Sequence, residues 1–222
     1  MPARIRFPPV RAAALLVAVA AVTTISGPAG KPAAAPLPQP AVPPAALLPT
    51  ETLPGAPAAR DVFDVATALS TADRKDGTEC SDVVHGRLLG PGTATGQGFQ
   101  TAIPGGQLSE LVARTPHPAD LATWTAQVRR CAEVTVDDED LPTVSTLTLG
   151  TAPAVPGAET VSYQQVLTLP GQPADRPGLR LRTVAIAADD VLVVLRDAGA
   201  TDVDLTTLAV TAWQHAAARL GR

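Results

Sequence analysis

A proline- and alanine-rich stretch over residues 28–57 most constrains what this chain can fold into. Proline fixes φ and lacks an amide hydrogen, so such a stretch forms neither a regular helix nor an interior strand. We expect an extended, disordered tether of polyproline type. Leu47, Leu48 and Leu53 recur toward its end, where order is expected to begin as these side chains dock on the domain. The body of that domain is assigned to residues 58–222.

The segment before the tether has the features of an export signal. Arg4, Arg6 and Arg11 form a positive start, and residues 12–22 are uninterrupted Ala, Leu and Val. This run is shorter than the roughly 20 apolar residues of a membrane span, which favours a signal segment over residues 1–27. The small residues that follow are not a clean A-x-A cleavage site, so an uncleaved anchor is the alternative. We expect a secreted or cell-envelope-associated protein that contacts a membrane only if the signal is kept.

The composition limits both the core and the partners. Aromatic residues are only 3% of the chain, so the core must consist mainly of Val, Leu, Ile and Ala. Such a core gains from a covalent staple. The formal net charge is -4. Nucleic-acid binding demands a basic face, so nucleic acid is not expected as a partner.

The two cysteines, Cys80 and Cys131, are predicted to form a disulfide. An exported chain meets an oxidising compartment, in which a cysteine pair is most simply oxidised. The loop between them spans about 50 residues, and closing it stabilises the fold by roughly 4 kcal/mol in the chain-entropy model. Two buried free thiols are the alternative. A catalytic cysteine is not expected, because no Cys-His signature surrounds either residue.

Helical spacing predicts two helices in the middle of the domain. Leu108, Leu111 and Val112 have the i, i+3, i+4 spacing of a buried stripe that Pro116 ends. A second stripe follows Pro118, a good first-turn residue. Its members, at intervals of three, four and three, are Leu121, Trp124, Val128 and Cys131. Before these helices, residues 98–103 read as a strand and residues 61–71 as a strand or a short helix.

Beyond Cys131 the apolar period changes to two, which indicates strands. They are predicted around residues 133–136, 146–149, 161–169, 179–187 and 191–195. Asp204 is the expected N-cap of a closing helix. Helices and strands in separate blocks predict an α+β domain with a mainly antiparallel sheet of about five to six strands and helices packed on one face.

Several motifs occur in an order that resembles a known family. They are Leu-Leu-Pro and Leu-Pro-Gly within residues 47–55, the Trp-containing helix that runs through Cys131 into a strand over 124–136, Ser-Tyr-Gln-Gln at 162–165, the strand pair 182–195 and the Ala-rich terminal helix. The order is similar to that of the extracellular sensor domain of PknH-type bacterial serine/threonine kinases and its free-standing secreted or lipoprotein relatives. The resemblance covers roughly residues 46–222. The chain departs from it in having no kinase domain ahead of the signal and one cysteine pair where the kinase sensors carry two.

The resemblance implies a cleft that binds a small extracellular ligand without catalysis. Trp124, Tyr163 and Gln165 are candidates to line it, and the alternative for both aromatic side chains is the core. Arg180 and Arg182 alternate with leucines and are candidates to grip a carboxylate or phosphate. A solvated strand face is the alternative for these arginines.

No cofactor, metal site or catalytic residue is predicted. The acidic run at residues 137–140 lacks the spacing of a calcium loop and is expected to be a solvated turn. His85, His117 and His215 show no metal-ligand spacing.

Three functions follow in order of preference. The first is an exported, non-enzymatic binding domain for an unknown small extracellular ligand. The second is an envelope interaction or scaffold protein that recognises a protein partner. The third is an envelope hydrolase, for which the sequence names no residues.

Overall fold

The computed structural model describes residues 41–71, 80–90, 92–136, 142–173 and 176–222. The predicted signal segment 1–27, the first part of the tether and the acidic run 137–140 lie outside the described residues. In the part that is described, no helix combines the length and the apolar character needed to span a bilayer.

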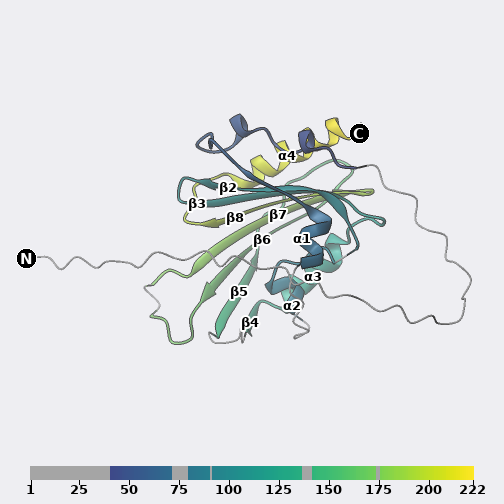
Figure 1. Cartoon of the computed structure of the whole chain (residues 1–222). Helices are drawn as coiled ribbons and strands as arrows, with labels where there is room; N and C mark the ends of the chain where they lie inside the picture. Colours follow the sequence, from purple (N-terminus) through teal and green to yellow (C-terminus); the bar gives the residue numbers. More distant parts are fainter. Residues whose placement is uncertain (1–40, 72–79, 91, 137–141, 174–175) are drawn as a thin grey trace, which may run out of the picture. The chain divides into compact units, whose positions relative to one another are not determined.

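The frame is an eight-stranded sheet in which all neighbouring strands pair antiparallel, in the order β1-β2-β3-β8-β7-β6-β5-β4 (Figure 1). The strands are β1 (Asp61–Asp64), β2 (Thr95–Ile103), β3 (Gly106–Arg114), β4 (Glu133–Val136), β5 (Thr143–Leu149), β6 (Glu159–Thr168), β7 (Leu179–Ala188) and β8 (Val191–Gly199). The α+β class and the antiparallel pairing are confirmed. The predicted strand number is too low, because β3 was predicted as a helix and the segment 61–71, which holds both β1 and α1, was left open between a strand and a short helix.

Strand β3 corrects the helix predicted from Leu108, Leu111 and Val112. Leu108 and Val112 are four positions apart, a spacing that puts two residues on one face of a helix and also on one face of a strand. Leu111 lies on the opposite face of β3, in contact with a different cluster. A tight turn at residues 104–105 pairs β3 with β2, and Gly105 supplies its positive φ of 82°.

Helices cover both faces of the sheet, which corrects the prediction of one covered face (Figure 1). One face carries α4 (Leu205–Arg219) with the short 3-10 helices η1 (Pro44–Ala46) and η2 (Thr50–Thr52). The other carries α1 (Val65–Thr71), α2 (Ser81–Val84) and α3 (Leu121–Arg130). The central strand β7 requires both layers, because Val184 and Ile186 are buried on one side and Ala185 and Ala187 on the other.

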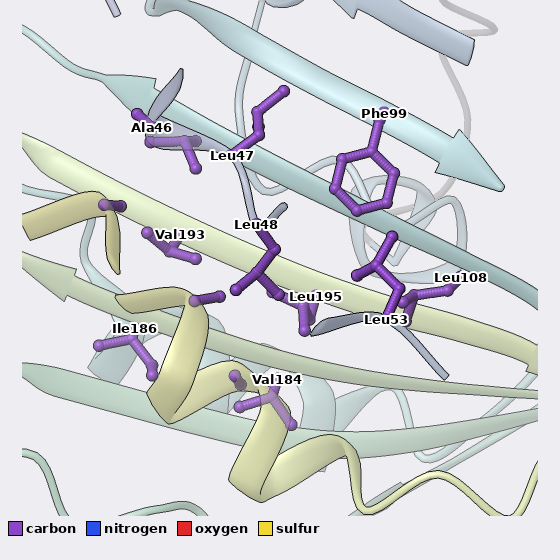
Figure 2. Close-up of a cluster of buried hydrophobic side chains, with 14 of the residues drawn as sticks. Ala46, Leu47, Leu48, Leu53, Phe99, Leu108, Val184, Ile186, Val193 and Leu195 are labelled. Atoms are coloured by element: carbon purple, nitrogen blue, oxygen red, sulfur yellow. The ribbon is translucent and has the colours of Figure 1, made fainter. Parts of the chain in front are cut away.

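The α4-side core takes in the segment around η1 and η2. Leu47, Leu48 and Leu53 are buried there against strands β2, β3 and β8, as Figure 2 shows for Leu48 beside Leu195. The predicted docking of these leucines is therefore confirmed. The N-cap of α4 is confirmed too, because Asp204 accepts a hydrogen bond of 3.0 Å from the Thr207 amide.

The predicted disulfide joins Cys80, at the start of α2, to Cys131, at the end of α3, with their Cα atoms 5.6 Å apart. It ties two short helices of the α3-side layer together. The segment that leaves α2, residues 85–90, is thereby held over the sheet, where it forms part of the site described next.

Candidate functional site

A row of polar side chains crosses the α3-side face of the sheet. Antiparallel pairing sets Gln100 opposite Ser109, Ser109 opposite Arg196, Arg196 opposite Thr183 and Thr183 opposite Tyr163. Directly paired residues share a face, so five strands contribute one row. The row lies on a face whose other buried positions are mainly apolar.

The β2 to β8 part of this row is the floor of a cavity of about 190 Å³, here named the arginine pocket. Phe63 of β1, Leu69 of α1, and Leu88 and Leu89 beyond α2 give it apolar walls that are half-buried. A second hollow, of about 540 Å³, lies between the turn at 104–105 and α4. Most of the residues that line the larger hollow are exposed, so it is a surface groove.

Arg196 is the charged centre of the arginine pocket. Its Nε donates to Thr183 Oγ1 at 3.0 Å, and Nη2 lies 3.5 Å from the Tyr163 hydroxyl. Among the described residues, no carboxylate forms an ion pair with Arg196 and no acceptor takes a hydrogen bond from Nη1. The side chain is half-buried. A cation is thus held at the floor of a largely apolar cavity by neutral hydroxyl groups.

Two other charged residues line the pocket without neutralising Arg196. Arg87 is paired with Asp82, whose Oδ1 accepts from Nε at 3.1 Å, and also donates to Ser81 Oγ. Glu110 lines the pocket with its backbone only. Its carboxylate lies on the opposite face of the sheet, where it accepts a hydrogen bond from the Leu48 amide at 2.9 Å.

Gly86 makes room for the Arg196 guanidinium. Its φ is 63°, and a Cβ at this position would overlap the guanidinium nitrogens. The chain that leaves α2 passes so close over the arginine that the guanidinium keeps this position only beside a residue without a Cβ.

Gly86→Ala is expected to cost about 1 kcal/mol for the left-handed alanine and to push the flexible end of the Arg196 side chain off the Thr183 and Tyr163 hydroxyls, so that the loss of these hydrogen bonds adds to the strain. Gly157→Ala is the matched control, because Gly157 has a φ of 74° and open space around its Cβ position. Urea unfolding measures both variants. Equal losses of stability would show that Arg196 does not press on Gly86.

The structure places three of the predicted ligand residues in or beside the α3-side core. Trp124 and Tyr163 are 6% and 4% exposed, and their ring centroids are 6.5 Å apart. Gln165 is buried and donates to the Val84 carbonyl at 2.8 Å and to Ser145 Oγ at 2.9 Å. Of the three, Tyr163 contacts Arg196, whose Nη2 lies 3.5 Å from its hydroxyl.

Arg180 and Arg182 lie on the opposite face of the sheet and are not brought together with these three residues. Arg180 donates to the carbonyls of Gly199 and Thr201. Arg182 donates to both carboxylate oxygens of Asp197 and to the Val203 carbonyl, and the hydrogen bonds that Asp197 accepts raise the pKa of Arg182. Both arginines hold the loop that leads into α4.

The sequence reasoning missed Arg196, although a signal for it was present. Leu192, Val194 and Arg196 share one face of β8 by period two, and Leu192 is fully buried. An arginine that continues an inward-facing row is a buried-charge candidate. Its partners Gly86 and Ser109 carried no such signal.

The geometry defines an α+β domain with a largely apolar pocket, charged at its floor, between the sheet, α1 and the chain that leaves α2. Within the described residues, no group of three or more His, Cys, Asp or Glu side chains is placed to hold a metal ion. No family model and no curated protein sequence matches the chain.

Two solved structures are similar to it. The first is an uncharacterised protein from Mycobacterium smegmatis, with 14% identity, a TM-score of 0.47, and coverage of 73% of this chain and 90% of that chain. The second is the extracellular domain of PknH from Mycobacterium tuberculosis, with 16% identity, a TM-score of 0.43, and coverage of 74% and 82%. The PknH extracellular domain is thus among the structures that this chain resembles, as the sequence motifs predicted.

Proposed function

We propose that this chain is an exported, non-enzymatic binding domain that takes a small extracellular ligand in the arginine pocket. The observation that carries the proposal is Arg196, a half-buried cation with no carboxylate partner among the described residues. A sheltered charge without a counterion in the protein is typical of a binding site, in which the ligand supplies the opposite charge.

The size of the pocket supports a small ligand. Sites for drug-sized molecules measure roughly 300–1,000 Å³. The arginine pocket has about 190 Å³, so it suits a metabolite of one ring or one short chain.

The chemistry of the lining supports binding over catalysis. A nucleophilic site pairs its nucleophile with a base. The Ser109 hydroxyl is directed at the Arg196 carbonyl oxygen, 3.4 Å away, and the carboxylate of Glu110 lies on the other face of the sheet. Export is supported by the Cys80–Cys131 disulfide, which persists in oxidising compartments.

The test is ligand capture by the folded domain. Incubated with culture metabolites and envelope fragments, the purified domain is expected to retain a small molecule that native mass spectrometry detects and that raises Tm. Ser109→Phe fills the pocket floor and should abolish both effects, whereas Thr148→Phe, at an exposed position of β5, should not. Failure of every fraction to yield a bound species, or retention by Ser109→Phe, contradicts the proposal.

A further inference from the structure

We infer that the ligand of the arginine pocket is a small organic carboxylate, whose carboxylate binds Arg196 and whose apolar part contacts Phe63, Leu69 and Leu88. This assignment rests on the proposed function and specifies its ligand class. It follows from the charge of the floor, the hydrogen-bonding groups around it and the nature of the walls.

The charge requires an anion. A guanidinium that is half withdrawn from water beside apolar walls loses hydration that an ion pair restores. Thr183 and Tyr163 contact Nε and Nη2, and both are neutral. Within the described residues Nη1 donates to no acceptor, so this nitrogen of the planar guanidinium can donate a hydrogen bond to a carboxylate oxygen of the ligand.

The surroundings favour a single negative charge. Arg87, the other cation of the lining, is paired with Asp82. Arg196 therefore contributes one positive charge that no described side chain balances, which matches a carboxylate better than a doubly charged phosphate ester. Ser109 and Gln100 lie beside Arg196 on the same row and add a hydroxyl and a carboxamide for the second oxygen.

The walls favour an apolar body of limited size. Phe63, Leu69, Leu88 and Leu89 surround the floor with aromatic and aliphatic groups. A cavity of about 190 Å³ equals the liquid volume of about six water molecules. A free inorganic anion would leave these walls without contact, whereas a ring or a short chain fills the space.

Benzoate and benzamide form the test pair, because they have the same shape and differ in charge. Titrations of the intact domain are followed by amide chemical shifts at Gly86 and Ser109. We expect benzoate to bind roughly tenfold or more tightly than benzamide, the ratio of a charged to a neutral hydrogen-bonded pair. Phenyl phosphate is the third probe, and tighter binding of phenyl phosphate than of benzoate overturns the choice of a carboxylate.

Variants assign the preference to one residue. Arg196→Gln should reduce the ratio of benzoate to benzamide affinity to about one, and Arg196→Lys, which keeps the charge but not the fork, should retain part of it. Arg219→Gln removes an exposed arginine of α4 and should leave the ratio unchanged. If Arg196→Gln does not fold, the ratio of benzoate to benzamide affinity in the wild type and in Arg196→Lys still tests the carboxylate assignment.

The outcomes separate the two proposals. Equal affinity for both probes, no benzoate binding, or a preference that survives in Arg196→Gln overturns the carboxylate assignment. If the molecule captured from the metabolite fractions is neutral and the Ser109→Phe variant does not capture it, the carboxylate assignment is also overturned, whereas the proposed binding function stands. Absence of any captured species contradicts the binding function itself.

Discussion

Removal of the disulfide, by Cys80→Ala together with Cys131→Ala, is expected to lower the free energy of unfolding by about 4 kcal/mol. The bond closes a loop with a sequence separation of 51, and opening that loop returns conformational entropy to the unfolded chain. Net stabilities of domains are about 5–15 kcal/mol, so the loss is a large share of the total.

The effect should also reach the arginine pocket. Cys80 begins α2, and the chain that leaves α2 places Gly86, Leu88 and Leu89 over the sheet. Without the link to α3 this wall is held by fewer contacts. The double variant should therefore lose more ligand affinity than variants that lose the same stability through a change elsewhere in the fold.

Denaturant unfolding of the oxidised protein, the reduced protein and the double variant provides the measurement. The reduced wild type should match the variant, and the variant should not respond to reductant. A double variant within about 1 kcal/mol of the oxidised wild type would contradict the predicted role of the loop.

The second large effect concerns Glu110 and the pH dependence of stability. Glu110 is 1% exposed and lies in the α4-side layer, beneath Leu48. Burial raises its pKa from 4.5 to about 7, against the opposing effects of the Leu48 amide and the positive charge of Arg60. Oε2 accepts from Leu48, and within the described part of the chain Oε1 has no hydrogen-bond partner.

The sign follows from which state binds more protons. Between pH 4.5 and about 7 the folded protein keeps the proton on Glu110 that the unfolded chain has released. The stabilising contribution is full below pH 4.5 and is lost as the pH rises through 7. By pH 8 the raised pKa of Glu110 has lowered the free energy of unfolding by about 3 kcal/mol relative to acidic pH.

Glu110→Gln tests this prediction, because glutamine keeps the shape and an oxygen for the Leu48 amide but carries no charge. Its unfolding free energy, relative to wild type, should rise by about 3 kcal/mol between pH 4.5 and pH 8, since all other titrations cancel in the difference. Parallel stability profiles for the two proteins would show that the pKa of Glu110 is the same in the folded and the unfolded state, and would contradict the prediction.

Elements with strong local signals were predictable from the sequence. The period-two segments around Val136, Leu149 and Leu195 are strands, α4 begins after Asp204, and Leu47 and Leu48 dock on the core. Each of these features is governed by neighbours in sequence or by a simple alternation of apolar residues. The disulfide followed from the count of cysteines and the expected compartment.

The sites depended on pairings between distant strands. Arg182 lies in a strand of alternating pattern and Arg196 follows a buried run, and the sequence analysis named Arg180 and Arg182, but not Arg196, among the candidate ligand-binding residues. The fold gives Arg182 a buried carboxylate, Asp197, whereas it gives Arg196 a pocket. Which face of a strand is filled and which is hollow depends on the elements that cover it, and these are remote in sequence.

Strand β3 shows the same limit within a single element. Leu108 and Val112 satisfy a helical spacing, yet pairing with β2 and β8 makes the segment an interior strand whose two faces contact different clusters. The sequence alone therefore determined the helices α3 and α4 and the alternating strands through local periodicity, and the covalent link through the cysteine count. The register across five strands, which assembles Arg196 with Ser109 and Tyr163, was decided only by the tertiary structure, because hydrogen-bonded pairing joins residues whose separation in sequence leaves no local pattern.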